Sequence, residues 1–242
     1  MFSKKYLEDQ DLEFLKDCDN KDLVAFADLL VYGDDDKKRI SESLSGTRLY
    51  QANYPNNMKA VYKELIHEFQ LFGGDTIANS FRGHGVTYSE ILKDVCDKKK
   101  VSYNKSTSIP RLEMYLLQKL VDDTLDNMDE VQLKDTLEEL KLDSNDYNST
   151  DAMKDAIAIA LMSPQFVNYI LQFILRAVAP KLAGQLLLVG GVGFARLGGM
   201  LVPAINIVMA AWMLKDITGP AFRVIIPGVI MIIYMRKKVQ AN

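Results

Sequence analysis

The residue types best suited to binding chemistry lie together near position 80, in the run Arg82-Gly83-His84-Gly85. Glycines on both sides of a histidine let a ligand approach the backbone closely. An arginine beside them can hold a phosphate or a carboxylate through two parallel hydrogen bonds. The run lacks the Gly-Lys-Ser/Thr ending of a phosphate-binding loop. We therefore weigh an anion-binding turn against a tight turn that holds Arg82 in an ion pair.

A basic cluster, Lys98-Lys99-Lys100, follows further along the chain. Clustered lysines can meet lipid headgroups, or an anionic ligand such as a nucleotide or an oligonucleotide. Lysines are also favoured at the C-terminal end of a helix, where they complement the helix dipole, so a solvated helix end is the alternative. The candidate ligand-binding residues are Arg82, Gly83, His84, Gly85, Lys98, Lys99 and Lys100.

Enzymatic and metal-binding patterns are weak in this sequence. It contains two histidines, and His67 lies beside Glu64 and Glu68 on a charged helix face, which favours a solvated or capping role. No HExxH, phosphate-binding-loop or zinc spacing occurs. The two cysteines, Cys18 and Cys96, form no CxxC pair, so we expect two buried free thiols. We predict a non-enzymatic protein with no catalytic residue, no cofactor and no metal.

Charge divides the 242-residue chain into two unlike parts, although its formal net charge is only −3. Residues 1–155 carry 21 Lys and Arg against 31 Asp and Glu, a net charge of −10. Residues 156–242 carry 8 Lys and Arg against one acid, a net charge of +7. The first residues of the chain include acidic side chains and no apolar h-region, so they do not have the pattern of a signal peptide. We expect the acidic part to stay in the cytosol.

Apolar residues in the acidic part recur at helical spacing, and no segment alternates with period two for long enough to form a strand. A Thr-x-x-Glu capping box at Thr87 and Glu90 opens one helix, and Pro110 suits the first turn of the next. The polar run 143–150 is the best candidate for a linker. The expected helices cover about 58–72, 88–99, 110–127 and 129–141.

The tail consists mostly of uncharged apolar runs, at residues 156–175, 182–195, 197–214 and 224–235. A membrane-spanning helix needs about 20 such residues, and the basic run Arg236-Lys237-Lys238 suits a cytoplasmic flank. We therefore predict an all-α protein with a cytosolic helical domain over 1–150 and a Gly-rich helical transmembrane domain over 156–238. Two cytoplasmic ends require an even number of spans, two or four. A soluble bundle with a hydrophobic core helix is the alternative.

Small and charged residues inside the tail indicate how its helices could interact. Small residues let helices approach closely, either within one chain or between subunits around a pore. The glycines concerned are Gly190, Gly191, Gly193, Gly198 and Gly199. The charged residues are Arg196, Asp216 and Arg223. Ionisable residues inside a membrane are functional candidates. The structural alternative is an ion pair between Asp216 and Arg223 at a helix junction.

Three segments carry a family resemblance. Residues 6–15 read YLEDQDLEFL, residues 72–95 contain FGGDTIANSFRGHG and YSEILKDV, and residues 216–227 read DITGPAFRVIIP. Together they resemble the YaaW-like bacterial family, which is grouped with the ubiquinol–cytochrome c chaperone family, except that Phe222 replaces a tyrosine in the closing motif. The chaperone grouping implies the binding of a client protein. The apolar tail departs from that pattern and fits membrane insertion better than client release.

These observations predict an oligomeric protein of the bacterial inner membrane, with its N-terminal domain and its C-terminus in the cytoplasm. By analogy of layout, it would be a channel or a membrane-disrupting effector, as in phage defence, gated by a ligand or partner of its cytosolic domain. The expected partners are membrane lipid, further copies of the chain, and an anionic nucleotide or oligonucleotide or a regulatory protein. The alternative function is a membrane-anchored assembly factor or chaperone that binds a protein client.

The channel hypothesis predicts that the purified protein releases an encapsulated dye from liposomes, or conducts ions across them, under a condition that opens it. The assay therefore includes candidate anionic ligands and variants of the residues near Arg82 and His84. Intact liposomes under every ligand and variant condition contradict the channel hypothesis.

Overall fold

The computed structural model describes residues 7–33, 37–74, 85–178, 192–213 and 221–241. These residues form helices and connecting turns, with one isolated bridge between Tyr32 and Lys38 and no named strand among them. The prediction of an all-α protein is confirmed for this part of the chain. The chain divides into two compact units: unit 1 is Met1–Lys98 with Leu214–Asn242, and unit 2 is Lys99–Met213. This division differs from the predicted boundary near residue 150.

Unit 1 combines the N-terminal helices with the last helix of the chain. The predicted capping box opens α5, because the Thr87 hydroxyl accepts from the Glu90 N–H at 3.3 Å and the Glu90 carboxylate accepts from the Thr87 N–H at 3.0 Å. The helices of unit 1 are η1 (Glu13–Asp17), α1 (Asn20–Val31), η2 (Leu44–Gly46), α2 (Arg48–Asn53), η3 (Met58–Val61), α3 (Tyr62–Gly73), α5 (Tyr88–Lys98) and α12 (Phe222–Ala241).

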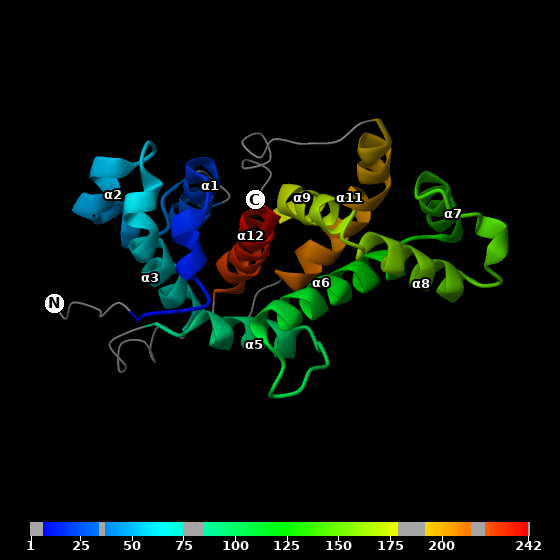
Figure 1. Ribbon diagram of the computed structural model, residues 1–242, viewed down its shortest axis with the longest axis horizontal. Helices are drawn as coiled ribbons and strands as arrows, with labels where there is room; N and C mark the ends of the chain where they lie inside the picture. The colour runs from blue at the N-terminus through cyan, green and yellow to red at the C-terminus, as the bar shows by residue number, and fades with distance from the viewer. Residues whose placement is uncertain (1–6, 34–36, 75–84, 179–191, 214–220, 242) are drawn as a thin grey trace. The chain divides into compact units, whose positions relative to one another are not determined.

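The last helix, α12, forms the core of unit 1. It packs against η1, α1, α3 and α5, and Figure 1 shows it next to α1. Every residue from 224 to 233 is buried. Gly228 lies directly on the Phe69 ring, where a Cβ would come within 2.4 Å of Phe69 Cε2. An apolar run of 10–14 residues suits a buried core helix better than a membrane span. The run 224–235, which we expected to belong to a transmembrane domain, is therefore the core of a folded unit.

The basic run after this core contacts the N-terminal helices. Arg236 donates to the Asp11 carbonyl oxygen at 2.7 Å, and its guanidinium lies 4.3 Å from the centre of the Phe14 ring. Lys238 forms ion pairs with Asp19 and with Asp22, each at 2.6 Å, and the Asp22 side chain is only 1% exposed. These cations fix the end of α12 within unit 1, whereas the sequence suggested that they flank a membrane span.

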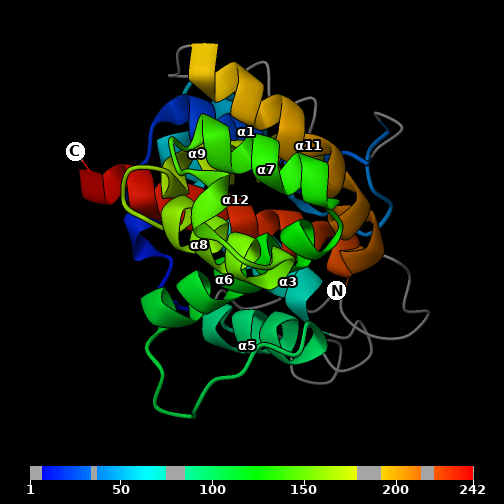
Figure 2. The ribbon, with the colours of Figure 1, turned by 90° about the vertical axis from the view of Figure 1, so that its right-hand side faces the viewer.

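Unit 2 is a bundle in which α11 packs against α6, α7 and α9, and α8 packs against α6 and α7. Figure 2 shows α7 running alongside α11. Pro110 lies in the first turn of α6 as predicted. The polar run 143–150 connects α7 to α8 inside this unit, so it does not separate the two units. The helices of unit 2 are α6 (Ile109–Asp126), α7 (Glu130–Glu139), η4 (Ser144–Asp146), α8 (Thr150–Leu161), α9 (Val167–Val178) and α11 (Val192–Trp212).

The uncharged run 156–175 does not form one helix. Helix α8 ends at Leu161 and α9 begins at Val167, with Pro164 between them. Proline has no N–H to donate and disfavours helical backbone at the residue before it. Within the described residues, a single helical segment, Ala195–Trp212, is long and apolar enough to cross a membrane, with a mean hydropathy of 1.4. The predicted transmembrane domain with an even number of spans is therefore not confirmed.

The Lys238 ion pairs give a stability prediction for unit 1. Burial opposes the charge on Lys238, but hydrogen bonds to Asp19 and Asp22 outweigh this effect and raise the pKa of the ammonium group above its ordinary value of 10.5. Lys238→Met should lower the free energy of unfolding at pH 7 by about 3–5 kcal/mol, because the buried Asp22 carboxylate loses its cation. The difference between wild type and variant should shrink above pH 10.5, where the ammonium group loses its proton. It should also shrink at acid pH, where the Asp22 carboxylate, whose pKa is raised by burial, takes up a proton.

Urea unfolding followed by circular dichroism measures this difference. The matched control is Lys237→Met, which removes the neighbouring cation and leaves both ion pairs intact; it should change the free energy by less than about 0.5 kcal/mol. Equal losses of stability in the two variants contradict a specific role for Lys238.

Candidate functional site

The predicted anion-binding run is described only at its last residue. Arg82, Gly83 and His84 lie outside the described residues, so their ligand-binding role stays a prediction. Gly85 packs on the backbone of Gln70, where a Cβ would come within 2.4 Å of the carbonyl carbon. A side chain at position 85 would therefore push the chain away from α3, which explains the glycine by packing alone.

A buried carboxylate that the sequence did not single out holds the start of α5. Asp9 accepts from the Tyr88 N–H at 2.6 Å and from the Gln70 side-chain amide at 3.3 Å. The same amide also donates to the Leu7 carbonyl oxygen at 3.0 Å. This cluster joins the N-terminal segment to α3 and α5, so it is an element of the fold. The sequence offered no signal for it, because its partners are more than 60 residues apart.

The lysine cluster is engaged in contacts within each unit. In unit 1, Lys98 Nζ lies 5.7 Å from the centre of the Phe222 ring. In unit 2, Lys99 Nζ donates to the Trp212 carbonyl oxygen at 2.7 Å and lies 5.3 Å from the centre of the indole ring. Lys100 is exposed and has a φ of 58°. Lys98 and Lys99 thus have structural contacts, while a role of the cluster in ligand binding stays a prediction.

The predicted packing glycines separate into different environments. Gly190 and Gly191 lie outside the described residues, and Gly193 belongs to the first turn of α11. Gly198 packs on α9, where a Cβ would come within 2.7 Å of Phe173 Cε1. Gly199 has no atom within 4 Å of the position that a Cβ would occupy. Gly198 therefore serves close packing within one chain, whereas Gly199 lies on an open surface.

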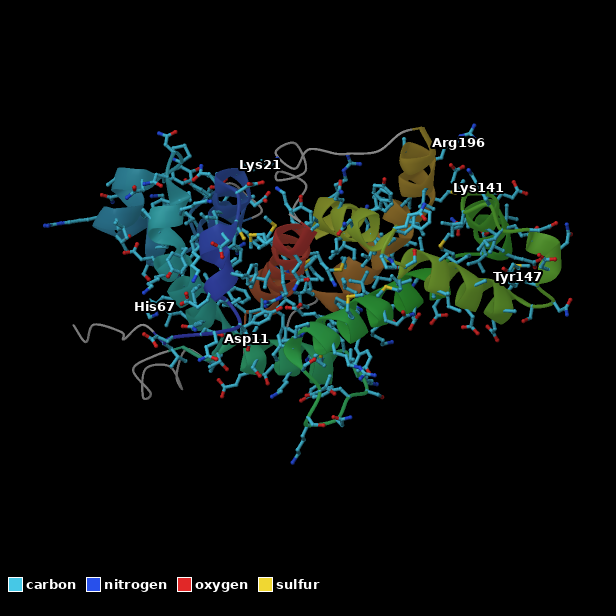
Figure 3. The ribbon with its side chains drawn as sticks, in the orientation of Figure 1. Asp11, Lys21, His67, Lys141, Tyr147 and Arg196 are labelled. Atoms are coloured by element: carbon cyan, nitrogen blue, oxygen red, sulfur yellow. The ribbon has the colours of Figure 1, made fainter. Side chains whose placement is uncertain are left out.

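The charged residues of the tail are also separated. Asp216 lies outside the described residues, so the predicted ion pair with Arg223 stays a prediction; Arg223 is exposed in the first turn of α12. Arg196 extends outward from α11 (Figure 3), its side chain is 72% exposed, and it lies 4.0 Å from a Glu139 carboxylate oxygen. The contact is long and the Glu139 side chain is only 18% exposed, whereas the Arg196 guanidinium remains largely open to water and therefore to another anion.

One face of α11 is exposed and largely apolar, and we call it the α11 outward face. Its members recur at spacings of three and four residues, as one side of a helix requires. The α11 outward face consists of Ala195, Arg196, Gly199, Pro203, Asn206, Ile207, Ala210 and Ala211. The buried side of the same helix consists of Leu197, Leu201, Ala204, Ile205, Val208, Met209 and Trp212. A bundle helix normally turns a polar face to water, but here only Arg196 and Asn206 are polar.

A polar cluster fixes the C-terminal end of α11 in unit 2. The Trp212 indole N–H donates to Asp123 Oδ2 at 3.0 Å, and Lys119 donates to the other oxygen of the same carboxylate at 2.5 Å. Lys99 donates to the Trp212 carbonyl oxygen, where a cation also complements the negative end of the helix dipole. The orientation of the α11 outward face is therefore set by packing on one side and by this cluster at the end.

This cluster gives a prediction for unit 2. Asp123→Ala should lower the free energy of unfolding by about 1–3 kcal/mol, because the buried indole N–H loses its acceptor. It should also change the emission maximum of Trp212, which is the only tryptophan in the chain. Asp122→Ala, an exposed neighbour on the same helix, is the control and should cost less than about 0.5 kcal/mol. Equal effects of the two substitutions contradict the role of Asp123.

Comparison with known proteins assigns a family to the chain. Residues 6–40 match the family model described as a domain of unknown function, DUF3944. The chain is 36% identical to a UPF0174 protein of Helicobacter pylori strain J99 over 239 residues, which cover 97% of this chain and 94% of the relative. It is 32% identical to the UPF0174 protein YaaW of Escherichia coli K12 over 241 residues, which cover 98% of each. No solved structure shows a significant match.

The YaaW-like resemblance is thereby confirmed over almost the whole chain. The comparisons do not show the grouping with ubiquinol–cytochrome c chaperones, which stays a prediction. With full-length relatives at these identities, the chain belongs to the UPF0174 family.

Proposed function

We propose that this protein works as a helical binding protein at the cytoplasmic face of the bacterial inner membrane, and that α11 is the element in contact with lipid. The observation that carries the proposal is the incomplete burial of an apolar helix. The segment Ala195–Trp212 has a mean hydropathy of 1.4, yet only 44% of it is buried. Exposed apolar surface of this kind is characteristic of interaction sites.

The charge of the surrounding sequence supports a lipid partner. No Asp or Glu occurs between Asp155 and Asp216, while Arg176, Lys181 and Arg196 supply positive charge. The cytoplasmic leaflet is anionic and attracts a nearby Lys or Arg by about 1 kcal/mol each. The segment between these two acids therefore presents only positive charge to an anionic membrane.

A pore built from the described helices would be an assembly of several chains. Within the described residues, one chain supplies a single helix of the required length and hydropathy, and one helix cannot enclose a channel. In its more specific form, the proposal is that such an assembly acts as a ligand-gated channel or a membrane-disrupting effector, including a role in phage defence. The dye-release assay described above is its test.

A protein client is the second candidate, and one feature of the α11 outward face favours it. Ala195, Gly199 and Ala210 are exposed and small, and small side chains let another helix approach closely. An assembly factor would use this face to hold an apolar helix of its client. Stoichiometric co-purification of one membrane protein, retained when lipid is absent, distinguishes this function from lipid binding.

Flotation with vesicles tests the membrane proposal. The full-length protein should float through a density gradient with vesicles of phosphatidylethanolamine and phosphatidylglycerol. Ile207→Glu should lower the vesicle partition coefficient, calculated from the floating fraction, by at least about tenfold, because the charge must enter the apolar interface.

Ile159→Glu is a matched control for this experiment. Ile159 is 76% exposed on α8 and Ile207 is 57% exposed on α11, so both substitutions place the same charge on an exposed isoleucine of unit 2. The control should float like the wild type. A wild-type protein that stays in the dense fractions contradicts the proposed function.

A further inference from the structure

We infer that α11 lies parallel to the membrane surface, with the α11 outward face against the headgroups and upper acyl chains of an anionic phospholipid bilayer, and does not cross the bilayer. This inference rests on the proposed function and assigns the contacting surface and its orientation. The partner that we assign to this face is the lipid surface. One outcome of the test below would indicate a protein partner in its place.

The composition of the α11 outward face suits a membrane surface. From Ala195 to Ala211 it covers sixteen residue steps, a length of about 24 Å along a helix. Its only charge is a cation, Arg196, which is 72% exposed at the N-terminal end. A long cationic side chain can lie along apolar surface and extend its guanidinium to a lipid phosphate. The face thus combines apolar area with charge that complements an anionic leaflet.

The charged helix that packs beside α11 opposes a crossing of the bilayer. Helix α7 contacts α11 and contains five charged residues, Glu130, Lys134, Asp135, Glu138 and Glu139. If α11 crossed the bilayer with its present neighbours, α7 would enter the hydrocarbon as well. Each charge at that depth costs about 2.5–3.5 kcal/mol even on the most permissive scale. Crossing would therefore require α11 to leave α7, whereas lying on the surface preserves unit 2.

The path of the chain also opposes a single crossing by α11. The chain leaves unit 1 at Lys98 and returns to it at Leu214, and α12 is then buried among the N-terminal helices. Both ends of the intervening segment must therefore lie on the same side of a membrane. A single crossing by α11 breaks this condition. Among the described residues, α9, with 12 residues, extends about 18 Å and is too short for a second crossing of a hydrocarbon core of about 30 Å. Most of the predicted apolar run 182–195 lies outside the described residues.

Depth-dependent fluorescence quenching tests this orientation in the full-length protein. Single cysteines are introduced at the start, middle and end of the α11 outward face, as Ala195→Cys, Pro203→Cys and Ala211→Cys, and are labelled with an environment-sensitive fluorophore. The native Cys18 and Cys96 do not compete for the reagent at neutral pH, because both are buried and burial raises the pKa of each thiol to about 12. Ile159→Cys on α8 is the matched control.

Each labelled protein is mixed with phosphatidylethanolamine–phosphatidylglycerol vesicles that carry a spin label either near the headgroup or deep in the acyl chain. For a helix in the membrane plane, the shallow label should quench positions 195, 203 and 211 by similar factors, and neither label should quench position 159. Stronger quenching of position 203 by the deep label indicates a spanning helix and overturns this inference while leaving membrane binding intact.

The remaining outcomes separate the two proposals. Quenching at position 159 without quenching on α11 means that another surface of unit 2 contacts lipid, which overturns this inference alone. No quenching at any position, together with failure to float, overturns the proposed function as well and leaves a protein partner as the occupant of the α11 outward face.

Discussion

The return of the last helix to the N-terminal part of the chain is the constraint on which the rest of the structure depends. Helix α12 supplies a continuous apolar core of unit 1, against which η1, α1, α3 and α5 pack. Apolar burial has no preferred direction, so the end of α12 is positioned by Lys238 with Asp22 and by Arg236 with the Asp11 carbonyl oxygen. Unit 1 is complete only when the twenty residues of this helix have joined it.

The same return restricts what the intervening unit can do at a membrane. Because residues 98 and 214 both belong to unit 1, unit 2 begins and ends on one side of any bilayer that it meets. Within unit 2, α11 is covered on one side by other helices and open on the other. A half-covered apolar helix is suited to lie on a surface, and its anchored end at Trp212 keeps its open side directed outward.

Local features of this fold could be predicted from sequence because their causes lie within a few residues. The capping box at Thr87 and Glu90, the proline in the first turn of α6 and the two buried free thiols are confirmed. The expectation that the uncharged run 156–175 is long enough for one membrane-spanning helix was wrong, because the run is divided between α8 and α9. Pro164, which lies between these helices, was a signal against it in the sequence. The clusters around Asp9 and Asp123 could not be predicted, because they join residues separated by 61 to 89 positions.

The sequence by itself determined the helical class, the family and the concentration of apolar residues and positive charge in the tail, since composition and short-range periodicity control these properties. Only the tertiary structure decided what covers each apolar run. Hydrophobic transfer depends on the area removed from water and not on the chemical identity of the cover. A run buried by protein, as in α12, and a run left partly open, as in α11, therefore look alike until the neighbouring helices are in place.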